Sequence, residues 1–174
     1  SYGQGHRGSV LMRGRPVDTS TVEKAIAAGI SYVTEDRKAL GLILEEPILK
    51  NISLANLSGI AVRGILDKRR ETKVAEEYRK ALSIRTPGVQ QKVLNLSGGN
   101  QQKVVLSKWL FTDPQVLILD EPTRGIDVGA KYEIYTIMND LAAQGRGVVM
   151  ISSEMPELLG MCDRIYVMNE GRIV

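Results

Sequence analysis

The sequence predicts an α/β fold in which a mostly parallel sheet is flanked by helices. Three short runs, at residues 30–33, 116–119 and 148–151, are largely apolar without alternation, which is typical of strands covered on both faces. Segments with helical periodicity lie between these runs, an order that favours a parallel sheet. Asp120 and Glu121 follow one of the runs directly, at the end of a strand where ligands bind in sheets of this kind.

The first part of the chain predicts short elements. Residues 10–12 form an apolar run between glycines and indicate an edge strand. Ser20 and Glu23 have the spacing of a helix N-cap and its partner, so a helix is expected from there to Gly29. Residues 34–47 are expected to form a loop.

The middle of the chain predicts a helical region. A short helix is expected at 51–57 and a longer one at 67–82, where apolar residues share one helical face. Residues 59–64 form a weak linker between them. A further helix is expected to open at Ser97 and to end at Asp113, which precedes a proline.

The last third alternates between strands and helices. The strand at 116–119 is followed by a helix at 130–143, a strand at 148–151, a short helix at 156–161 and a strand at 165–168. This alternation is the pattern of a parallel α/β sheet.

Composition indicates a globular protein and argues against a nucleic-acid partner. Of the 174 residues, 43% are hydrophobic and 25% charged, with a net charge of +3, so an ordinary apolar core can form. The densest basic stretch, residues 68–70, is followed by Glu71, Glu76 and Glu77, which is typical of a solvated helix face. Cys162 is the only cysteine, so no intrachain disulfide can form.

The apolar runs are all far shorter than the roughly 20 residues that span a bilayer. The first 15 residues are rich in glycine and arginine and contain no apolar segment of the kind found in secretory signals. The protein is therefore expected to be soluble, or attached to a membrane only through a partner.

Asp120 and Glu121 are the first candidates for chemistry. A carboxylate at the end of a buried strand can hold Mg²⁺, as in phosphate-binding ATPases. A second carboxylate beside it can take a proton from an attacking water. Taken alone, the segment can also be a plain polar exit from the strand.

Ser97, Gly98 and Gly99 open a predicted helix and form the second candidate. Two glycines allow an anion to approach the backbone, and the free N–H groups at a helix N-terminus favour phosphate. Ser97 can cap the helix or donate its hydroxyl to a phosphate oxygen. An isolated Ser-Gly-Gly segment is more often a plain capping turn.

Together the two segments resemble motifs of the ATP-binding cassette (ABC) ATPases. Residues 96–103, Leu-Ser-Gly-Gly-Asn-Gln-Gln-Lys, are similar to the signature motif, residues 117–122 to the Walker B strand and residues 123–127 to the D-loop. The resemblance covers nearly the whole chain in the family's order. Within the superfamily, Asn100 and residues 152–154 resemble the C-terminal ATPase half of bacterial monosaccharide importers.

The resemblance implies a P-loop NTPase fold in one partial nucleotide-binding domain, with an α/β core at residues 1–47 and 95–174 and a helical subdomain at about 48–94. It implies ATP and Mg²⁺ as cofactors. The implied partners are the N-terminal ATPase half of the same polypeptide, the transmembrane permease subunits and, indirectly, a periplasmic sugar-binding protein, with no nucleic acid. The implied location is peripheral, at the cytoplasmic face of the bacterial inner membrane.

In the family, each ATP lies between the phosphate-binding loop of one domain and the signature motif of the other. The resemblance therefore implies that Asp120 helps to hold Mg²⁺ and that Glu121 polarises the attacking water. The residues that it assigns to nucleotide contacts, some of them across the domain seam, are Ser97, Gly98, Gly99, Asn100, Gln101 and Asp127.

Three features depart from the family's pattern. No Gly-x-x-x-x-Gly-Lys-Ser/Thr sequence occurs, so the chain is expected to be a fragment whose Walker A loop lies upstream of Ser1, and the glycine-rich segment 3–8 is expected to be a surface loop. Glu35 stands where the family has a glutamine and is a further candidate for the nucleotide and its Mg²⁺. Ser153 stands where the family has its switch histidine and is a candidate donor to the γ-phosphate in catalysis.

Two functions stay open. Intact Asp120 and Glu121 favour a transport ATPase half, whereas Glu35 and Ser153 favour a catalytically weak or regulatory half that contributes mainly its signature motif. A DNA-repair or chromosome-structure ATPase of the superfamily is disfavoured, because residues 32–96 are too few for its coiled coil and carry no sustained heptads.

Overall fold

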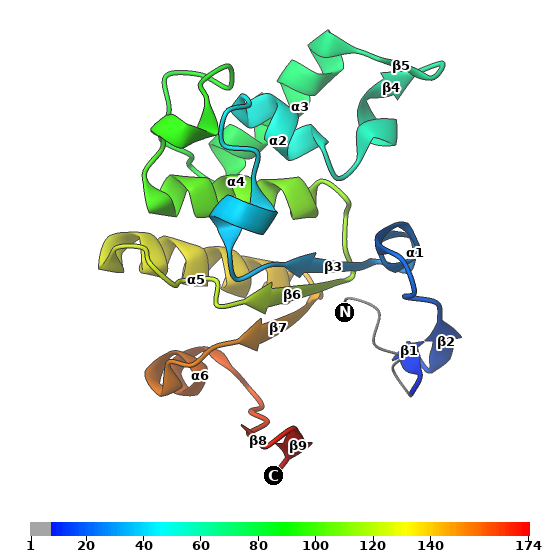
Figure 1. Ribbon diagram of the computed structural model, residues 1–174, viewed down its shortest axis with the longest axis vertical. Coiled ribbons are helices and arrows are strands. Elements are labelled where there is room, and N and C mark those ends of the chain that lie inside the picture. Colours follow the sequence, from blue (N-terminus) through cyan, green and yellow to red (C-terminus); the bar gives the residue numbers. More distant parts are fainter. Residues whose placement is uncertain (1–7) are drawn as a thin grey trace.

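The computed structural model describes residues 8–174 and confirms the α/β fold. Its centre is a parallel three-stranded sheet in the order β3-β6-β7. Figure 1 shows helices α4 and α5 along one side of this sheet, with α2 and α3 stacked beyond α4. The bounds are β3 Ile30–Val33, β6 Val116–Asp120, β7 Gly147–Ile151, α4 Gly98–Leu110 and α5 Val128–Ala143.

The predicted edge strand exists, but it pairs outside the main sheet. Strand β1 (Val10–Met12) forms an antiparallel hairpin with β2 (Arg15–Val17). Arg13 and Gly14 both have positive φ, at 50° and 76°, as a tight hairpin turn requires. Residues 3–7 of the glycine-rich segment lie outside the described residues.

Helix α1 (Val22–Ala27) has a different N-cap from the one predicted. Thr21 is the cap, because its side chain accepts a hydrogen bond from the Lys24 amide at 3.3 Å. The Ser20 amide instead donates to the Asp18 carboxylate at 2.9 Å. Because this turn engages Ser20, the helix starts one residue later, and the prediction of Ser20 as the cap was wrong.

The helical region was predicted in outline, with shifted boundaries. Helix α2 (Ile48–Ser53) begins three residues early, directly after Pro47, and a 3₁₀ turn at Leu57–Ile60 overlaps the start of the predicted linker at 59–64. A two-residue hairpin, β4 (Ala61–Val62) and β5 (Ile65–Leu66), follows. Helix α3 (Lys68–Ala81) matches the prediction, and Asp67 caps it by accepting the amides of Arg69 and Arg70.

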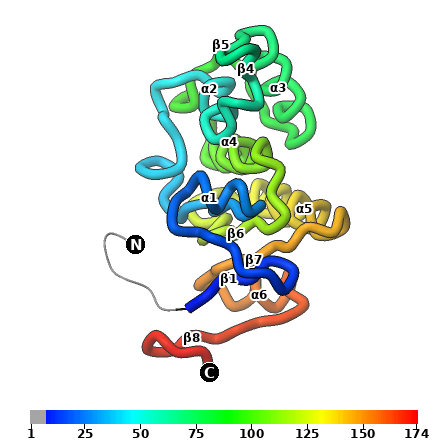
Figure 2. The backbone as a smooth tube through the Cα atoms, turned by 90° about the vertical axis from the view of Figure 1, so that its right-hand side faces the viewer, coloured from blue at the N-terminus to red at the C-terminus, as the bar shows by residue number. Residues whose placement is uncertain are grey.

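The end of the chain differs from the predicted strand at 165–168. Helix α6 (Met155–Met161) agrees with expectation, but β8 (Met168–Asn169) and β9 (Arg172–Ile173) form a small antiparallel hairpin. Figure 2 shows this hairpin apart from the main sheet. Glu170 and Gly171 have positive φ of 47° and 76°, so a tight turn there folds the chain back on itself.

Only one face of the main sheet is fully packed. Val33 and Leu119 are buried on the face covered by α4 and α5, whereas Tyr32, Val149 and Ile151 on the other face are 41%, 48% and 46% exposed. Among the described residues, the prediction of strands covered on both faces was therefore wrong, because both long helices lie on the same side. None of the helices described for residues 8–174 combines the length and apolarity needed to cross a bilayer.

Helix α4 has no exposed residue and contains two buried lysines. Lys103 forms an ion pair with Glu133 at 2.7 Å and donates to the Ser83 carbonyl at 3.0 Å. Lys108 donates to the Gly41 carbonyl at 2.6 Å. The second contact ties the loop after β3 to the helix.

We expect Lys108 to make stability depend on pH. Burial lowers its pKa to about 8, below the value of about 10.4 in an unfolded chain. Between these values the unfolded state binds more protons, so the free energy of unfolding rises with pH. In urea titrations from pH 7.5 to 11, the gain should be about 2–3 kcal/mol larger for wild type than for Lys108→Met. Parallel pH profiles for the two proteins would contradict this expectation.

Candidate functional site

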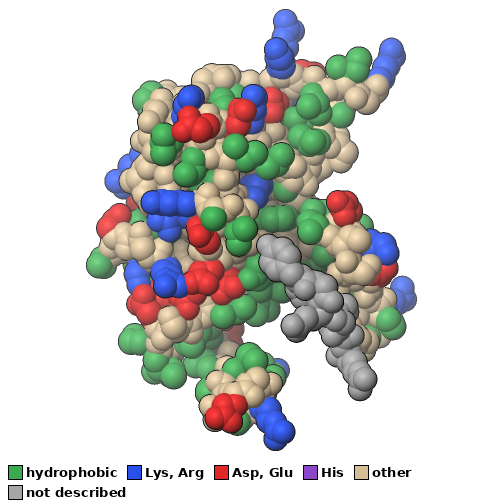
Figure 3. Space-filling view, in the orientation of Figure 1, with side chains coloured by type: hydrophobic (Ala, Val, Ile, Leu, Met, Phe, Trp, Pro, Cys, Tyr) green, Lys and Arg blue, Asp and Glu red, His purple; other side chains and the backbone are tan. Residues whose placement is uncertain are grey.

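The candidate residues lie where the parallel strands end. Strands β3, β6 and β7 run in the same direction, so their carboxyl ends share one edge of the sheet. Figure 3 shows acidic and basic side chains side by side on this part of the surface. We use "strand-end cluster" for Tyr32, Asp120, Glu121 and Ser153.

Glu121 has a fixed backbone and a fixed carboxylate. Its φ is 45°, in the left-handed region, and its amide donates to the Ile151 carbonyl at 2.9 Å. One carboxylate oxygen, Oε1, accepts the backbone N–H of Ser153 at 2.8 Å. The backbone of Ser153, rather than its hydroxyl, therefore orients this carboxylate at the end of β7.

Asp120 contacts a residue of the neighbouring strand. The Tyr32 hydroxyl donates a hydrogen bond to Asp120 Oδ2. This hydrogen bond, together with partial burial and the nearby negative charge, raises the pKa of Tyr32 to about 12. Tyr32 pairs in register with Ile118, two residues before Asp120, so both side chains lie on the same, half-exposed face of the sheet.

Glu35 does not stand free beside Asp120. Its carboxylate forms an ion pair with Arg124, in the loop after β6. Arg37 adds two bonds to the same loop, from Nη1 to the Arg124 carbonyl at 2.9 Å and from Nη2 to the Gly125 carbonyl at 3.3 Å. The segment after β3 therefore contacts the loop after β6 in two ways: Glu35 binds the side chain of Arg124, and Arg37 binds main-chain carbonyls.

Among residues 8–174, no group of three or more His, Cys, Asp or Glu side chains is arranged to hold a metal ion. Asp120 nevertheless fits Mg²⁺, which proteins usually bind through one or two carboxylates together with substrate phosphates. Within the part of the chain that the structure describes, its carboxylate has a single hydrogen-bond donor, the Tyr32 hydroxyl. Asp120 is thus a better candidate for the ion than Glu35, whose carboxylate already has a cationic partner.

The start of α4 carries an oriented hydroxyl. Ser97 occupies the N-cap position, but its side chain makes no capping bond. Instead its Oγ accepts Nδ2–H of Asn100 at 2.9 Å, and Asn100 Oδ1 accepts the Arg85 amide at 2.9 Å. Because Asn100 donates to the serine oxygen and needs only one of its lone pairs, the proton of the Ser97 hydroxyl is available to donate to another group.

A small polar hollow joins the starts of α4 and α5. Asp127 caps α5, because its Oδ1 accepts the Ala130 amide at 2.9 Å. The hollow has a volume of about 110 Å³, and we call its lining the signature cluster: Arg85, Ser97, Gly99, Asn100, Asp127, Gly129, Ala130 and Glu133. Two helix N-termini that meet at one hollow form a site suited to an anion.

The two glycines of the motif are needed for packing. A Cβ added at Gly99 would lie 2.4 Å from the Cβ of Ala130, so α4 and α5 are in close contact there. A Cβ added at Gly98 would lie 2.9 Å from Nη2 of Arg37 and 3.3 Å from the Gly125 carbonyl oxygen. The sequence reasoning explained these glycines only by the approach of an anion.

Gln101 does not reach this hollow. It is 5% exposed, and its Nε2 donates to the carbonyls of Val93 and Leu96, each at 3.3 Å. Its buried amide group therefore stabilises the turn that precedes α4. The structure brings together Ser97, Asn100 and Asp127 at the hollow, and Asp120, Glu121 and Ser153 at the strand ends.

Sequence reasoning missed three residues of the site. Tyr32 could be found from the strand register. It is a tyrosine in an apolar strand, and it pairs with Ile118, two residues before Asp120 on the neighbouring strand. Arg37 and Arg85 carry no such signal: Arg37 donates to main-chain carbonyls, and Arg85 contributes a backbone amide. Both contacts join segments that are distant in the sequence.

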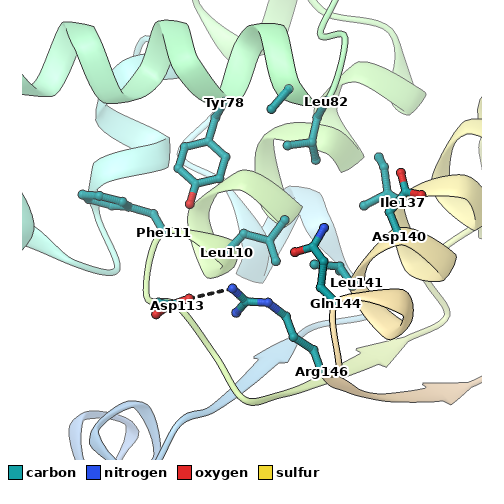
Figure 4. Close-up of a pocket in the computed structure, with 11 residues that line it drawn as sticks. Tyr78, Leu82, Leu110, Phe111, Asp113, Ile137, Asp140, Leu141, Gln144 and Arg146 are labelled. Carbon is teal, nitrogen blue, oxygen red and sulfur yellow. Dashed lines mark hydrogen bonds and ion pairs between the residues drawn. The ribbon is translucent and has the colours of Figure 1, made fainter.

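A larger cavity than this hollow lies elsewhere. It has a volume of about 470 Å³ between the C-terminal ends of α3, α4 and α5, and includes Tyr78, Leu82, Asp140 and Arg146 in its lining. Figure 4 shows Arg146 directed toward Asp113, with a contact of 2.7 Å. These helix ends are opposite the N-termini of α4 and α5 that form the signature cluster.

The fold and the arrangement of the strands define the class of the protein. Its structure is similar to a nucleotide-free ATP-binding cassette from an ABC transporter, with a TM-score of 0.77, 20% identity, and coverage of 97% of this chain and 68% of that one. It is also similar to an ADP-bound ATP-binding cassette of an ABC transporter, with a TM-score of 0.75, 21% identity, and coverage of 97% and 68%. The chain has the fold of an ABC ATPase domain.

The family model described as ABC transporter matches residues 2–124, and the chain belongs to this family. It is 61% identical to the L-arabinose transport ATP-binding protein AraG of Geobacillus stearothermophilus, over 99% of this chain and 34% of that protein. It is 56% identical to the xylose import ATP-binding protein XylG of Geobacillus kaustophilus, over 96% and 33%. It is 51% identical to the ribose import ATP-binding protein RbsA of Clostridium perfringens, over 95% and 33%. The chain spans about a third of the length of these relatives.

Proposed function

We propose that this chain is part of an ATP-hydrolysing subunit that energises monosaccharide import across the cytoplasmic membrane. The observation that carries the proposal is Glu121, whose carboxylate is held at the end of a parallel strand beside Asp120. The identities of 51–61% to subunits named for arabinose, xylose and ribose support a monosaccharide as the cargo.

The signature cluster would bind the terminal phosphate of an ATP molecule held mainly by another domain. The Ser97 hydroxyl, oriented by Asn100, would donate to a phosphate oxygen. The free backbone N–H groups at Gly98 and Gly99 would add donors at the positive end of α4. Since the relatives are about three times as long as this chain, we expect that other domain in the N-terminal ATPase half of the same polypeptide.

The strand-end cluster would act on a second ATP molecule. Glu121 would accept a proton from the attacking water, and the Ser153 amide would keep its carboxylate in place. Asp120 would hold Mg²⁺, which supplies positive charge against the phosphates when it is bound. Glu35 would act through Arg124, by holding the loop after β6 next to this site.

The proposed partners follow from the same function. The helical segment at about 48–94 would dock against transmembrane permease subunits, and a periplasmic sugar-binding protein would deliver the cargo to them. The subunit would lie at the cytoplasmic face of the membrane, with no nucleic acid involved. Exposed apolar side chains on this segment, including those of Leu54, Leu57, Val62 and Ile65, support a protein contact there.

A catalytically weak half is the second candidate. The observation that favours it is the Glu35–Arg124 ion pair, which withdraws one of the predicted Mg²⁺ ligands, while the signature cluster keeps an oriented Ser97 hydroxyl. In that case this half would serve mainly the ATP site of its partner. Asp120 and Glu121 would then contribute little to hydrolysis.

The proposal is tested by sugar uptake into vesicles. The full-length protein would be reconstituted with its permease subunits and a sugar-loaded binding protein, and uptake of labelled arabinose, xylose and ribose would be measured with and without ATP. We expect ATP-dependent uptake of one of these sugars, and ATP hydrolysis that the loaded binding protein stimulates. Hydrolysis that responds to no monosaccharide would contradict the proposed cargo.

We expect the change Tyr32→Phe to strengthen Mg²⁺ binding. The Tyr32 hydroxyl donates a hydrogen bond to the Asp120 carboxylate and so competes with Mg²⁺ for it. A hydrogen bond to a charged group contributes about 1.5 kcal/mol or more, and less where the group is half-exposed. The Mg²⁺ concentration for half-maximal ATP hydrolysis by the full-length protein should fall about three- to tenfold. Tyr166→Phe, at an exposed tyrosine, should leave it unchanged. A higher Mg²⁺ requirement in Tyr32→Phe would show that the hydroxyl assists the ion.

A further inference from the structure

A buried carboxylate lies behind the strand-end cluster. Glu157, in α6, is 7% exposed. Its Oε1 accepts the hydroxyls of Thr123 and Tyr135, both at 2.5 Å, and the ammonium of Lys131 at 3.1 Å, while Oε2 accepts the hydroxyl of Ser152 at 2.9 Å. Four donors from three other segments therefore meet at one side chain.

These donors fix the ionised form of the carboxylate. Burial alone would raise the pKa of Glu157, but hydrogen bonds, above all from Thr123, Tyr135 and Ser152, lower it to about 2. Lys131, which donates to Glu157, also forms an ion pair with Glu154 at 2.7 Å. Glu157 is thus an anion at any physiological pH.

The network joins the parts of the chain that surround Glu121. Thr123 lies two residues after Glu121 in the loop after β6, and Ser152 follows directly on β7. Ser152 also accepts the Glu154 amide at 3.0 Å. The peptide between Ser152 and Ser153 therefore has a set direction, and its N–H is the one that binds the Glu121 carboxylate at 2.8 Å.

We propose that Glu157 is a positioning residue for Glu121: its buried carboxylate anchors Ser152 and Thr123, so that the Ser153 amide and the strand end hold the Glu121 carboxylate in one orientation. Glu157 itself touches no nucleotide. The proposal rests on the proposed function, in which Glu121 accepts a proton from the attacking water.

A purely structural role for Glu157 would affect stability and leave the orientation of Glu121 alone. The two roles differ in enzyme kinetics, because a misplaced base lowers kcat while ATP binding, which Glu121 does not provide, stays intact. They also differ in a double-mutant cycle. A residue that acts through Glu121 has no further effect once Glu121 is replaced.

The first experiment measures ATP hydrolysis by the full-length protein with Glu157→Gln, which keeps the shape of the side chain and removes its charge. We expect kcat to fall by about tenfold or more, as for other small displacements of reacting groups, with KM for ATP within about twofold of wild type. Glu170→Gln, at an exposed glutamate in the turn between β8 and β9, is the matched control and should retain the wild-type rate. An unchanged kcat in Glu157→Gln would overturn the proposal.

The second experiment repeats Glu157→Gln in a Glu121→Gln background. We expect the residual rate to change by less than about twofold, because the group that Glu157 positions is already gone. A further tenfold loss would overturn the proposal. If Glu121→Gln alone leaves hydrolysis intact, the proposed function of Glu121 fails instead, so the two failures are distinguishable.

A third measurement does not depend on activity. Hydrogen exchange at the Ser153 amide reports its bond to Glu121 directly, and Glu157→Gln should accelerate it at least about fivefold relative to the Glu170→Gln control. If Glu157→Gln does not fold, Tyr135→Phe removes one donor and leaves the carboxylate in place, and it should give a smaller change in the same direction. Wild-type exchange at Ser153 in a folded variant would overturn the proposal.

Discussion

Glu121→Gln in the full-length protein should lower kcat for ATP hydrolysis by about 100- to 1000-fold, the range expected when a general base is removed. The amide keeps the shape of the side chain and can still accept the Ser153 amide, so the fold and the affinity for ATP should change little. Hydrolysis is measured at saturating ATP and Mg²⁺, and KM is determined alongside. ATP-dependent sugar uptake should fall in parallel.

The chain offers a matched control for this variant. Glu170 has nearly the same left-handed φ as Glu121, 47° against 45°, but it lies in the turn of the β8–β9 hairpin, away from the strand ends. Glu170→Gln should therefore retain full hydrolysis. If Glu121→Gln retains it as well, the second candidate function gains support, since this half would then contribute mainly its signature cluster.

Gly99→Ala should be the most damaging single change in the signature cluster. The added Cβ would lie 2.4 Å from the Ala130 Cβ, a separation that no rotamer change can relieve because the helix backbones fix the positions of both Cβ atoms. Overpacking of this kind costs about 1–3 kcal/mol, more than the roughly 1 kcal/mol gained by replacing glycine with alanine in a helix. We expect a net loss of about 1–2 kcal/mol in urea unfolding of the protein, and weaker nucleotide binding because Ser97 moves with the start of α4.

Two further variants separate contact from helix propensity. Gly160→Ala adds a Cβ in α6 with nothing within 4 Å and should not destabilise the protein. Adding Ala130→Gly to Gly99→Ala removes the opposing atom and should recover part of the loss. If Gly99→Ala alone is as stable as wild type, α4 and α5 are free to move apart and the close contact is not a constraint.

Periodicity and local signals were sufficient for the framework of the fold. The three parallel strands and the long helices α3, α4 and α5 each contain a run long enough to predict their type, with boundaries within a few residues. The errors occurred in short elements, where a single contact can decide whether the element forms and where it begins. Asp18 accepts the Ser20 amide and shifts a helix start by one residue. Residues 165–167, predicted as strand, are irregular, and only the two-residue strand β8 follows them.

The segments that carry the candidate site could be singled out from the sequence, but not the contacts that their side chains make. The end of β6 and the start of α4 were both singled out, and the structure places them at the strand-end cluster and at the signature cluster. The sequence does not reveal that the Gln101 side chain is buried and donates to a backbone carbonyl. Nor does it reveal that Glu35 forms an ion pair with Arg124, or that Asn100 donates to the Ser97 hydroxyl. Each outcome depends on which atoms come within hydrogen-bond distance after the helices have packed.

Arg37 has a consequence for how freely this sequence can vary. It donates hydrogen bonds to the backbone carbonyl oxygens of Arg124 and Gly125 in the loop after β6. Every residue type has such an oxygen. The side chain at position 124 can therefore be exchanged without loss of these two hydrogen bonds. A side chain at position 98 would require the Arg37 guanidinium to shift, because the guanidinium lies 2.9 Å from where a Cβ at Gly98 would be. These two positions are thus constrained as a pair, although 60 residues of chain lie between them.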